Sequence, residues 1–163
     1  MERLWSPWRM EYIQEARGDE EDGCVFCRVL ELPDDDPEAR ILVRRTLGFV
    51  TLAKYPYNPG HLLILPIRHV GDLGELRAEE SAEIDDLLKQ GVRALRDESD
   101  PAGFNIGLNL GRTAGAGIPG HLHWHVVPRW AGDTNFMPVI GETRVLPELL
   151  AETYGRLRGR FAS

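Results

Sequence analysis

The amino-acid sequence predicts an α+β fold, in which one long helix and a C-terminal helix pack on an antiparallel sheet of about five strands. Two observations lead to this prediction. Short β-rich runs occur both before and after a single long amphipathic segment, and a shorter helical segment closes the 163-residue chain. Strands, one long helix, further strands and a final helix form the order typical of an antiparallel sheet that carries helices.

Five segments have strand-forming composition and are bounded by turn residues. The first two are separated by the polar residues 44–46, as in a hairpin, and the third follows a loop of tyrosine, asparagine, proline and glycine at 55–60. The fourth and fifth flank a glycine-rich loop at 111–120. The expected strands are Ile41–Val43, Leu47–Leu52, His61–Ile67, Phe104–Leu110 and Leu122–Val127.

The longest helix is expected at Glu79–Arg96, where apolar residues recur with the i, i+3, i+4 and i+7 spacing of a single helix face. Acidic residues gather near its start and arginines near its end, which suits the helix dipole. A short helix is expected at Cys27–Leu30. The C-terminal helix is expected at Glu148–Leu157, directly after Pro147.

Length and composition bound the class of protein. A chain of 163 residues is expected to form one domain over residues 1–163, and 42% hydrophobic with 28% charged residues is a globular composition. The net charge of −7 argues against nucleic acid as a partner, because such binders need a clustered basic surface. The sequence has no signal-peptide pattern and no apolar run of about 20 residues, so no membrane partner is expected.

Cys24 and Cys27 are the two cysteines of the chain and lie three positions apart. Such a pair is not a disulfide framework for a chain of this size, so a cytoplasmic location is expected. The spacing alone fits a redox pair, half of a zinc site or two packed thiols.

Three histidines alternate with apolar residues along one expected strand. His121, His123 and His125 then form a row on one face, while Trp124 packs on the other face under the long helix. Three imidazoles in a row are poor core material, because each ring needs partners for two nitrogens. Two chemistries remain open: the histidines hold a zinc ion with an open coordination position, or one imidazole is a nucleophile that its neighbours orient.

The glycine-rich loop at 111–120 directly precedes the histidine row. Small residues such as Gly115 and Gly117 let backbone N–H groups approach an anion closely, so the loop is expected to cradle phosphate. Residues 115–120 also match G-x-G-x-x-G, but the match leads into a strand, whereas a dinucleotide fingerprint follows a strand and opens a helix.

These motifs together resemble the histidine-triad (HIT) superfamily of nucleotide hydrolases and transferases. The resemblance rests on the histidine row with its glycine loop, the Cys-x-x-Cys pair, Pro59-Gly60-His61, Pro66-Ile67-Arg68-His69 and Asn109. Two further segments, Leu4–Arg9 and Pro128–Phe136, look like the bacterial branch related to diadenosine tetraphosphate phosphorylases. The resemblance therefore implies a HIT-like fold for this chain.

The resemblance also implies a mechanism. The middle histidine, His123, would attack the α-phosphorus of a nucleotide and form a nucleotidyl-histidine intermediate, which water or inorganic phosphate then releases. His125 would contact the α-phosphate, and His121 and His61 would complete the catalytic group beside the nucleophile. Nucleotide or phosphate binding would involve Asn109, Gly115, Gly117 and His125.

A second group of residues is implied to hold a metal ion. Relatives that keep both cysteines pair them with two histidines, which here gives Cys24, Cys27, His69 and His121. Four filled positions make a closed, structural zinc site, and no organic cofactor is expected. Relatives are usually homodimers, so a homodimer is also implied.

Dinucleoside polyphosphates such as diadenosine tetraphosphate are the substrates that the resemblance favours, cleaved by phosphorolysis or hydrolysis, with inorganic phosphate as the acceptor in the first case. One alternative is a nucleoside phosphoramidase or a general nucleotidyl transferase. Others are a nucleotide-binding interaction module and a zinc hydrolase that uses the histidine row as metal ligands.

Overall fold

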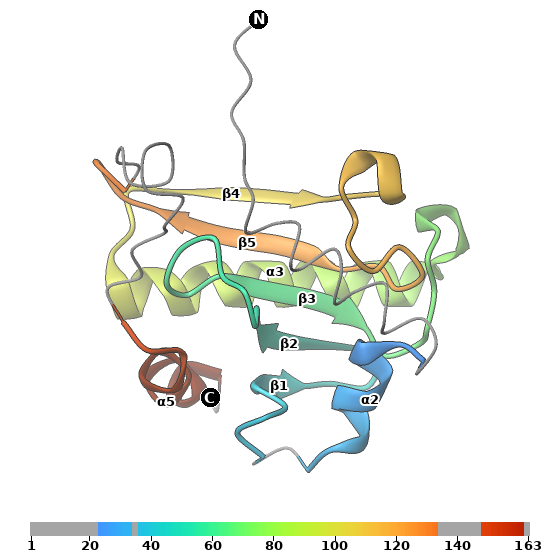
Figure 1. Ribbon diagram of the computed structural model, residues 1–163, viewed down its shortest axis with the longest axis horizontal. Coiled ribbons are helices and arrows are strands. Elements are labelled where there is room, and N and C mark those ends of the chain that lie inside the picture. The colour runs from blue at the N-terminus through green and yellow to red at the C-terminus, as the bar shows by residue number, and fades with distance from the viewer. Residues whose placement is uncertain (1–22, 34–35, 134–147, 162–163) are drawn as a thin grey trace, which may run out of the picture.

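The computed structural model describes residues 23–33, 36–133 and 148–161. Five strands form one antiparallel sheet in the order β1-β2-β3-β5-β4 (Figure 1). This confirms the predicted fold class, and the predicted strand ends lie within two residues of the observed ones. The strands are β1 (Ile41–Arg44), β2 (Gly48–Leu52), β3 (Leu62–Pro66), β4 (Gly103–Leu108) and β5 (Trp124–Arg129).

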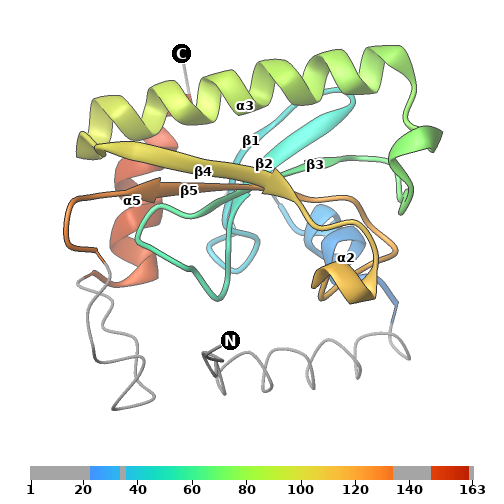
Figure 2. The same cartoon turned by 90° about the horizontal axis from the view of Figure 1, so that it is seen from above.

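Helices cover both faces of this sheet. The long helix α3 lies along one face and the short helix α2 on the other, as the view from above shows (Figure 2). α5 packs against α3 and β1. The helices are α2 (Val25–Glu31), α3 (Ala78–Ser99) and α5 (Leu150–Phe161). Two 3₁₀ turns lie in the connections, η1 (Leu73–Glu75) between β3 and α3 and η2 (Arg112–Ala114) between β4 and β5. Among the described helices, none combines the length and apolar composition that a membrane crossing requires.

All three described helices differ from the prediction at their ends, by one to four residues; α2 begins two residues earlier than predicted and ends one residue later. α3 continues to Ser99, and Asp100 ends it in the left-handed conformation with φ of 43°. α5 begins two residues later than predicted and continues four residues further, because Leu157 and Phe161 both bury their side chains in the core. The segment Leu4–Arg9, which supported the resemblance to one bacterial branch, lies outside the described residues.

The central strand β3 supplies both apolar cores. Leu62 and Ile64 point toward α3 and α5, whereas Leu63 and Leu65 point toward α2, and all four are buried. Strand β5 pairs with β3 and alternates in the same way, with Leu63 opposite His125 and Leu62 opposite Val126. Val126 and Trp124 therefore belong to the α3 side, which confirms the predicted direction of Trp124 and places His125 on the α2 side.

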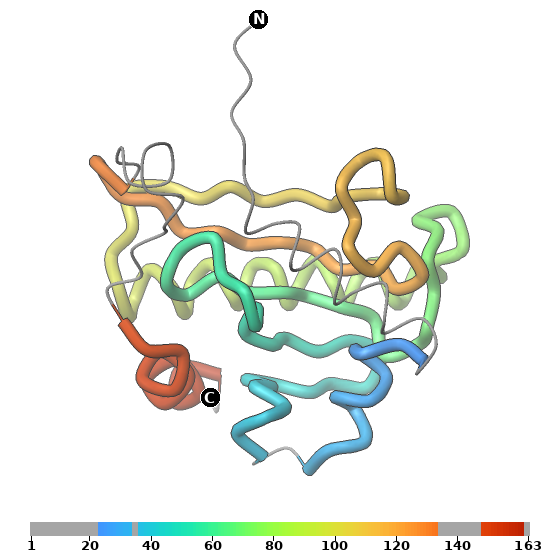
Figure 3. Tube along the Cα trace, viewed as in Figure 1, coloured from blue at the N-terminus to red at the C-terminus, as the bar shows by residue number. Residues whose placement is uncertain are grey.

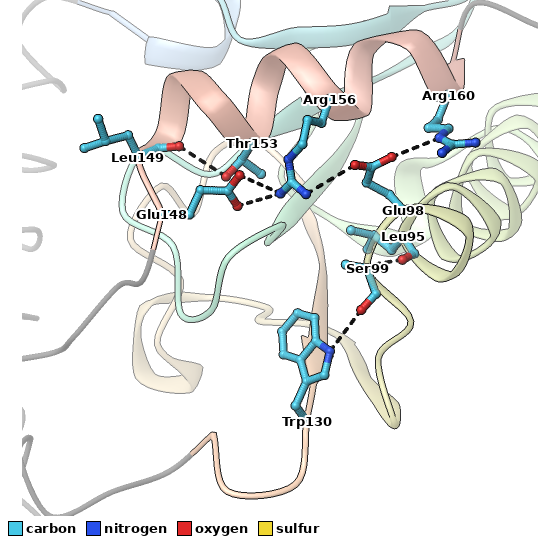
Figure 4. Close-up of polar contacts among 9 residues, drawn as sticks. All are labelled: Leu95, Glu98, Ser99, Trp130, Glu148, Leu149, Thr153, Arg156 and Arg160. Atoms are coloured by element: carbon cyan, nitrogen blue, oxygen red, sulfur yellow. Dashed lines mark hydrogen bonds and ion pairs between the residues drawn. The ribbon is translucent and has the colours of Figure 1, made fainter.

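A polar network joins the C-terminal ends of α3 and β5 to α5 (Figure 4). Arg156 lies between two carboxylates, at 3.2 Å from Glu98 and 2.6 Å from Glu148, and Arg160 also contacts Glu98. The indole N–H of Trp130 donates to the carbonyl of Ser99 at 3.1 Å. A cavity of about 400 Å³ is lined partly by these residues, and none of the five histidines is among the described residues around it.

Candidate active site and metal cluster

The histidine row lies on the α2 side of the sheet. The ring of His125 on β5 lies 5.1 Å from the rings of both His61 and His123, measured between centroids. His61, His121 and His123 are 2%, 0% and 2% exposed. The structure thus brings together the histidines that the sequence placed in one catalytic group, and their catalytic roles stay a prediction.

The strand that carries the row begins later than predicted. β5 starts at Trp124 and not at Leu122, because the backbone N–H of Leu122 donates to the carbonyl of Val70 at 2.8 Å instead of entering the sheet. His121 and His123 lie before β5 and are held by packing against α2. The ring of Phe26 contacts both imidazoles, with centroids 5.6 Å from His121 and 5.2 Å from His123. The tube view follows this segment from β4 into β5 (Figure 3).

The protonation of His123 follows from its neighbours. Its Nδ1 lies 2.8 Å from the backbone carbonyl of His121, and a carbonyl only accepts, so Nδ1 carries the proton and donates. Burial lowers the pKa of His123, which favours the neutral ring. A neutral imidazole with its proton on Nδ1 presents a lone pair at Nε2, the atom that a nucleophilic histidine uses.

A chain of hydrogen bonds also sets the protons of the other two rings. The backbone N–H of Tyr57 donates to Nδ1 of His61 at 3.1 Å, so a neutral His61 carries its proton on Nε2. That Nε2 lies 2.9 Å from Nδ1 of His125, which must then accept. A neutral His125 therefore has its own proton on Nε2. The ring of Tyr57 stacks on His61, with centroids 4.8 Å apart.

The two cysteines meet two histidines beside this row. Cys24 and Cys27 come from the start of α2, His69 follows β3, and His121 precedes β5, yet their ligand atoms all lie within 4.8 Å of one another. The sulfur atoms of Cys24 and Cys27 lie 3.4 and 3.7 Å from Nδ1 of His121, and Cys27 lies 3.4 Å from Nδ1 of His69. The predicted metal ligands are thus together.

The donor set fits a tetrahedral metal ion. Nitrogen and sulfur ligands at ordinary zinc distances are about 3.6 Å apart in a tetrahedron, close to the separations observed. Nε2 of His121 donates to the carbonyl of Pro66 at 2.9 Å, which leaves the lone pair of Nδ1 directed at the sulfurs. Burial lowers the pKa of His121 to about 4 and keeps its ring neutral. Burial and the neighbouring Cys24 raise the pKa of Cys27 to about 11, which means that its thiolate is disfavoured here. A bound cation would stabilise that thiolate.

The glycine-rich loop contains a 3₁₀ turn, η2, which the sequence reasoning missed. Gly111 and Gly115 flank this turn with φ of 79° and 95°, a region that residues with a Cβ rarely adopt. The N–H of Gly115 donates to the carbonyl of Arg112 at 2.9 Å and so shapes the loop itself. Asn109 follows β4 and is half-buried. Phosphate binding by Asn109, Gly115 and Gly117 stays a prediction.

Two buried polar groups near the site were missed as well. Glu80, 2% exposed, accepts two hydrogen bonds of 2.8 Å from Arg68, the residue before His69. Asn58, 5% exposed, lies in the loop before β3. Glu80 accepts the backbone N–H of Arg77 at 2.9 Å in the first turn of α3, but position 77 lacks the serine or threonine of a capping box, so the sequence carries no such signal. The burial of Asn58 has no local signal, because its partners lie about 70 residues further along the chain.

A buried histidine row on an antiparallel sheet, next to a Cys₂His₂ cluster, defines a histidine-triad protein. The model of the HIT domain matches residues 36–132. A protein of Mycobacterium tuberculosis named AP-4-A phosphorylase is 43% identical, and the match covers 99% of this chain and 85% of that protein. The chain therefore belongs to the HIT family, as its motifs predicted.

Two further proteins are similar to this chain, one in sequence and one in structure. An adenosine 5'-monophosphoramidase of Schizosaccharomyces pombe is 30% identical, with 65% of this chain and 74% of that protein matched. The crystal structure of a Zn-bound histidine triad family protein from Mycobacterium smegmatis is 30% identical, with a TM-score of 0.69 over 86% of this chain and 94% of that one. Together the relatives confirm the predicted class, a HIT-type enzyme.

Proposed function

We propose that this chain cleaves phosphoanhydride bonds at the α-phosphorus of nucleotides through a nucleotidyl intermediate on His123, with dinucleoside polyphosphates such as diadenosine tetraphosphate as substrates. One observation carries the proposal. The hydrogen bond of 2.8 Å from Nδ1 of His123 to the carbonyl of His121 leaves the lone pair of a buried, neutral ring on Nε2. The name of the Mycobacterium tuberculosis relative supports the substrate class.

In the first step, Nε2 of His123 attacks the α-phosphorus and forms an N–P bond. The P–O bond to the rest of the polyphosphate breaks, and its electron pair leaves on the departing oxygen, so that diadenosine tetraphosphate releases ATP. The Nε2–H of His125 supplies a hydrogen bond to the phosphate oxygens, on which negative charge is concentrated. His61 keeps that proton in place.

In the second step, an oxygen of inorganic phosphate attacks the same phosphorus. The N–P bond breaks, its electron pair returns to Nε2 of His123, and ADP is released. Water in place of phosphate would give AMP. The two steps use one nucleophilic atom, which fits the single unblocked ring nitrogen that the geometry of His123 provides.

We further infer that the cluster of Cys24, Cys27, His69 and His121 holds a structural zinc ion, as supported by the fit of its donors and by the Zn-bound relative. Four protein ligands leave no open position, so the ion would cross-link α2 to the chain before β5. His121 would then be held at its ring while its carbonyl orients His123. A zinc hydrolase built on the histidine row is disfavoured, because Nδ1 of His121 faces the cysteines and Nδ1 of His123 faces a carbonyl.

The test is product analysis in the presence and absence of inorganic phosphate. The protein is incubated with diadenosine tetraphosphate, and the nucleotides are separated by anion-exchange chromatography. The proposal predicts ADP and ATP in equal amounts, with ADP dependent on added phosphate. AMP and ATP at the same rate regardless of phosphate would identify a hydrolase, and adenosine phosphoramidate as the only substrate cleaved would favour the phosphoramidase alternative. The His123→Gln variant controls for contaminating activity.

A further inference from the structure

We propose that Asn58, Arg129 and Asp133 are positioning residues that hold the loop before β3 so that the protons on His61 and His125 stay on the nitrogens the reaction needs. This inference rests on the proposed function for its catalytic consequence. None of the three residues belongs to the histidine row, and their contacts lie on the route from the end of β5 to the backbone N–H of Tyr57.

The side chain of Asn58 anchors the loop. It is 5% exposed, and its Nδ2 lies 2.9 Å from both the carbonyl of Pro128 and Oδ2 of Asp133. Both partners accept only, since one is a carbonyl and the other a carboxylate. The reversed amide would direct its own oxygen at both of them, so the orientation of the Asn58 side chain is determined.

The carboxylate that Asn58 contacts is itself fixed. Arg129 binds Asp133 in bidentate fashion, with Nη2 at 2.8 Å from Oδ1 and Nε on Oδ2, and the backbone N–H of Trp130 adds a bond of 3.2 Å. The Asp133 side chain is only 11% exposed. Arg129 ends β5, so the loop is tied to the same strand that carries His125.

The anchor lies next to the group that sets the protons. The carbonyl of Asn58 accepts the backbone N–H of His61 at 3.1 Å, and the N–H of the preceding Tyr57 donates to Nδ1 of His61. The loop also passes close to α3: a Cβ on Gly60 would approach Leu95 to 2.8 Å. A shift of Asn58 therefore moves the N–H of Tyr57 away from the imidazole.

Loss of that one donor changes both rings. A neutral His61 without the bond from Tyr57 is free to carry its proton on Nδ1, and its Nε2 then becomes an acceptor. A neutral His125 would then carry its proton on Nδ1, because that atom has to donate to Nε2 of His61. Its Nε2 would then present a lone pair to the anionic substrate in place of a donor. The chemical step would slow although Asn58 touches no substrate atom.

The experiment determines which ring nitrogen carries the proton in His61 and in His125. Protein with ¹⁵N-labelled histidine and its metal is studied by two-bond ¹H–¹⁵N correlation, which distinguishes Nδ1–H from Nε2–H tautomers. The native protein is expected to show a single Nε2–H tautomer at His61 and His125. Asn58→Ala is expected to show mixed tautomers at both rings and a kcat at least about tenfold lower, with KM changed by less than about twofold.

The matched control is Asn105→Ala. Oδ1 of Asn105 accepts from Nη1 of Arg129 at 2.7 Å, and Asn105 is exposed, on the side of Arg129 away from its bidentate bonds to Asp133. This variant is expected to keep the native tautomers and kcat. Asp133→Ala is a second test that keeps the bond from Asn58 to Pro128, and it is expected to shift both readouts in the same direction as Asn58→Ala.

Native tautomers at both rings in folded Asn58→Ala and Asp133→Ala would overturn the inference, and so would a loss of activity that appears only in KM. The spectra need no substrate. If the native protein cleaves no dinucleoside polyphosphate while the tautomers still change in the variants, the proposed function fails and the positioning of the two rings stands.

Discussion

His121 belongs to two features at once. The Nδ1 atom of its ring faces Cys24 and Cys27, while its backbone carbonyl accepts the proton of His123. The ring is fully buried and its second nitrogen is bonded to Pro66. Whatever fixes the ring of His121 therefore also fixes the carbonyl that selects the nucleophilic nitrogen of His123.

Glu80 allows a prediction about acid stability. Its hydrogen bonds from Arg68 and from the backbone N–H of Arg77 lower the pKa of its carboxyl from 4.5 to about 2. A carboxylate with a depressed pKa stabilises the folded state above pH 4.5, and this contribution is lost as the pH falls toward 2. Glu80→Gln should therefore lower the free energy of unfolding near neutral pH, and the difference from the native protein should shrink between about pH 5 and about pH 2.

Urea denaturation at a series of pH values measures this difference. Glu79→Gln is the matched control, because Glu79 lies in the same first turn of α3 but is exposed. It should change the unfolding free energy much less than Glu80→Gln at every pH. A Glu80→Gln deficit that stays constant down to about pH 2 would show that the ion pair with Arg68 is not its source.

At the scale of the elements, α2 is a helix of seven residues that packs on the sheet through the buried Phe26 and partly buried aliphatic residues, with Cys24 and Cys27 at its start. Phe26 packs against the histidine row, and Cys24 and Cys27 face the two histidines. A helix this short is not stable by itself, so its position depends on these tertiary contacts. A metal ion in the cluster would therefore fix α2 on the sheet.

Removal of the metal should show this dependence. Chelation, or the substitution Cys24→Ser, should abolish bound zinc as measured by atomic emission and lower Tm by at least about 5 °C, because a closed structural site contributes to folding. His125→Ala is the control and should keep one zinc ion per chain. Equal zinc content in Cys24→Ser and the native protein would contradict the assignment, and so would zinc loss in His125→Ala.

The elements that sequence predicts best are those with a local pattern. α3 shows its apolar face within its own residues, and the β1–β2 hairpin shows its two runs and its polar turn. The predicted start of β5 was wrong because the backbone N–H of Leu122 donates to the carbonyl of Val70. Val70 lies 52 residues away along the chain, so no local pattern contains this contact. The anchoring role of Asn58 depends on Asp133 in the same way. The four candidate metal ligands could be grouped in advance because family resemblance, unlike spacing, joins distant motifs.

At the scale of the whole molecule, the net charge of −7 opposes a polyphosphate ligand. The proposed binding of such a ligand would therefore depend on local donors such as the histidine row and loop N–H groups. The edge strand β4 leaves Ile106 half exposed, at 51%. The implied homodimer stays a prediction, for which a light-scattering mass of twice one chain is the expected observation and a mass of one chain would contradict it.

The central claim is that His123 forms the covalent intermediate, and trapping that intermediate tests it most directly. The protein is mixed with diadenosine tetraphosphate without inorganic phosphate, quenched in alkali, where an N–P bond survives, and mapped by peptide mass spectrometry. The account predicts one adenylyl group on His123, released as ADP when phosphate is added before the quench, and no adduct in His123→Gln. An adduct on another residue, or native turnover by His123→Gln, would contradict it.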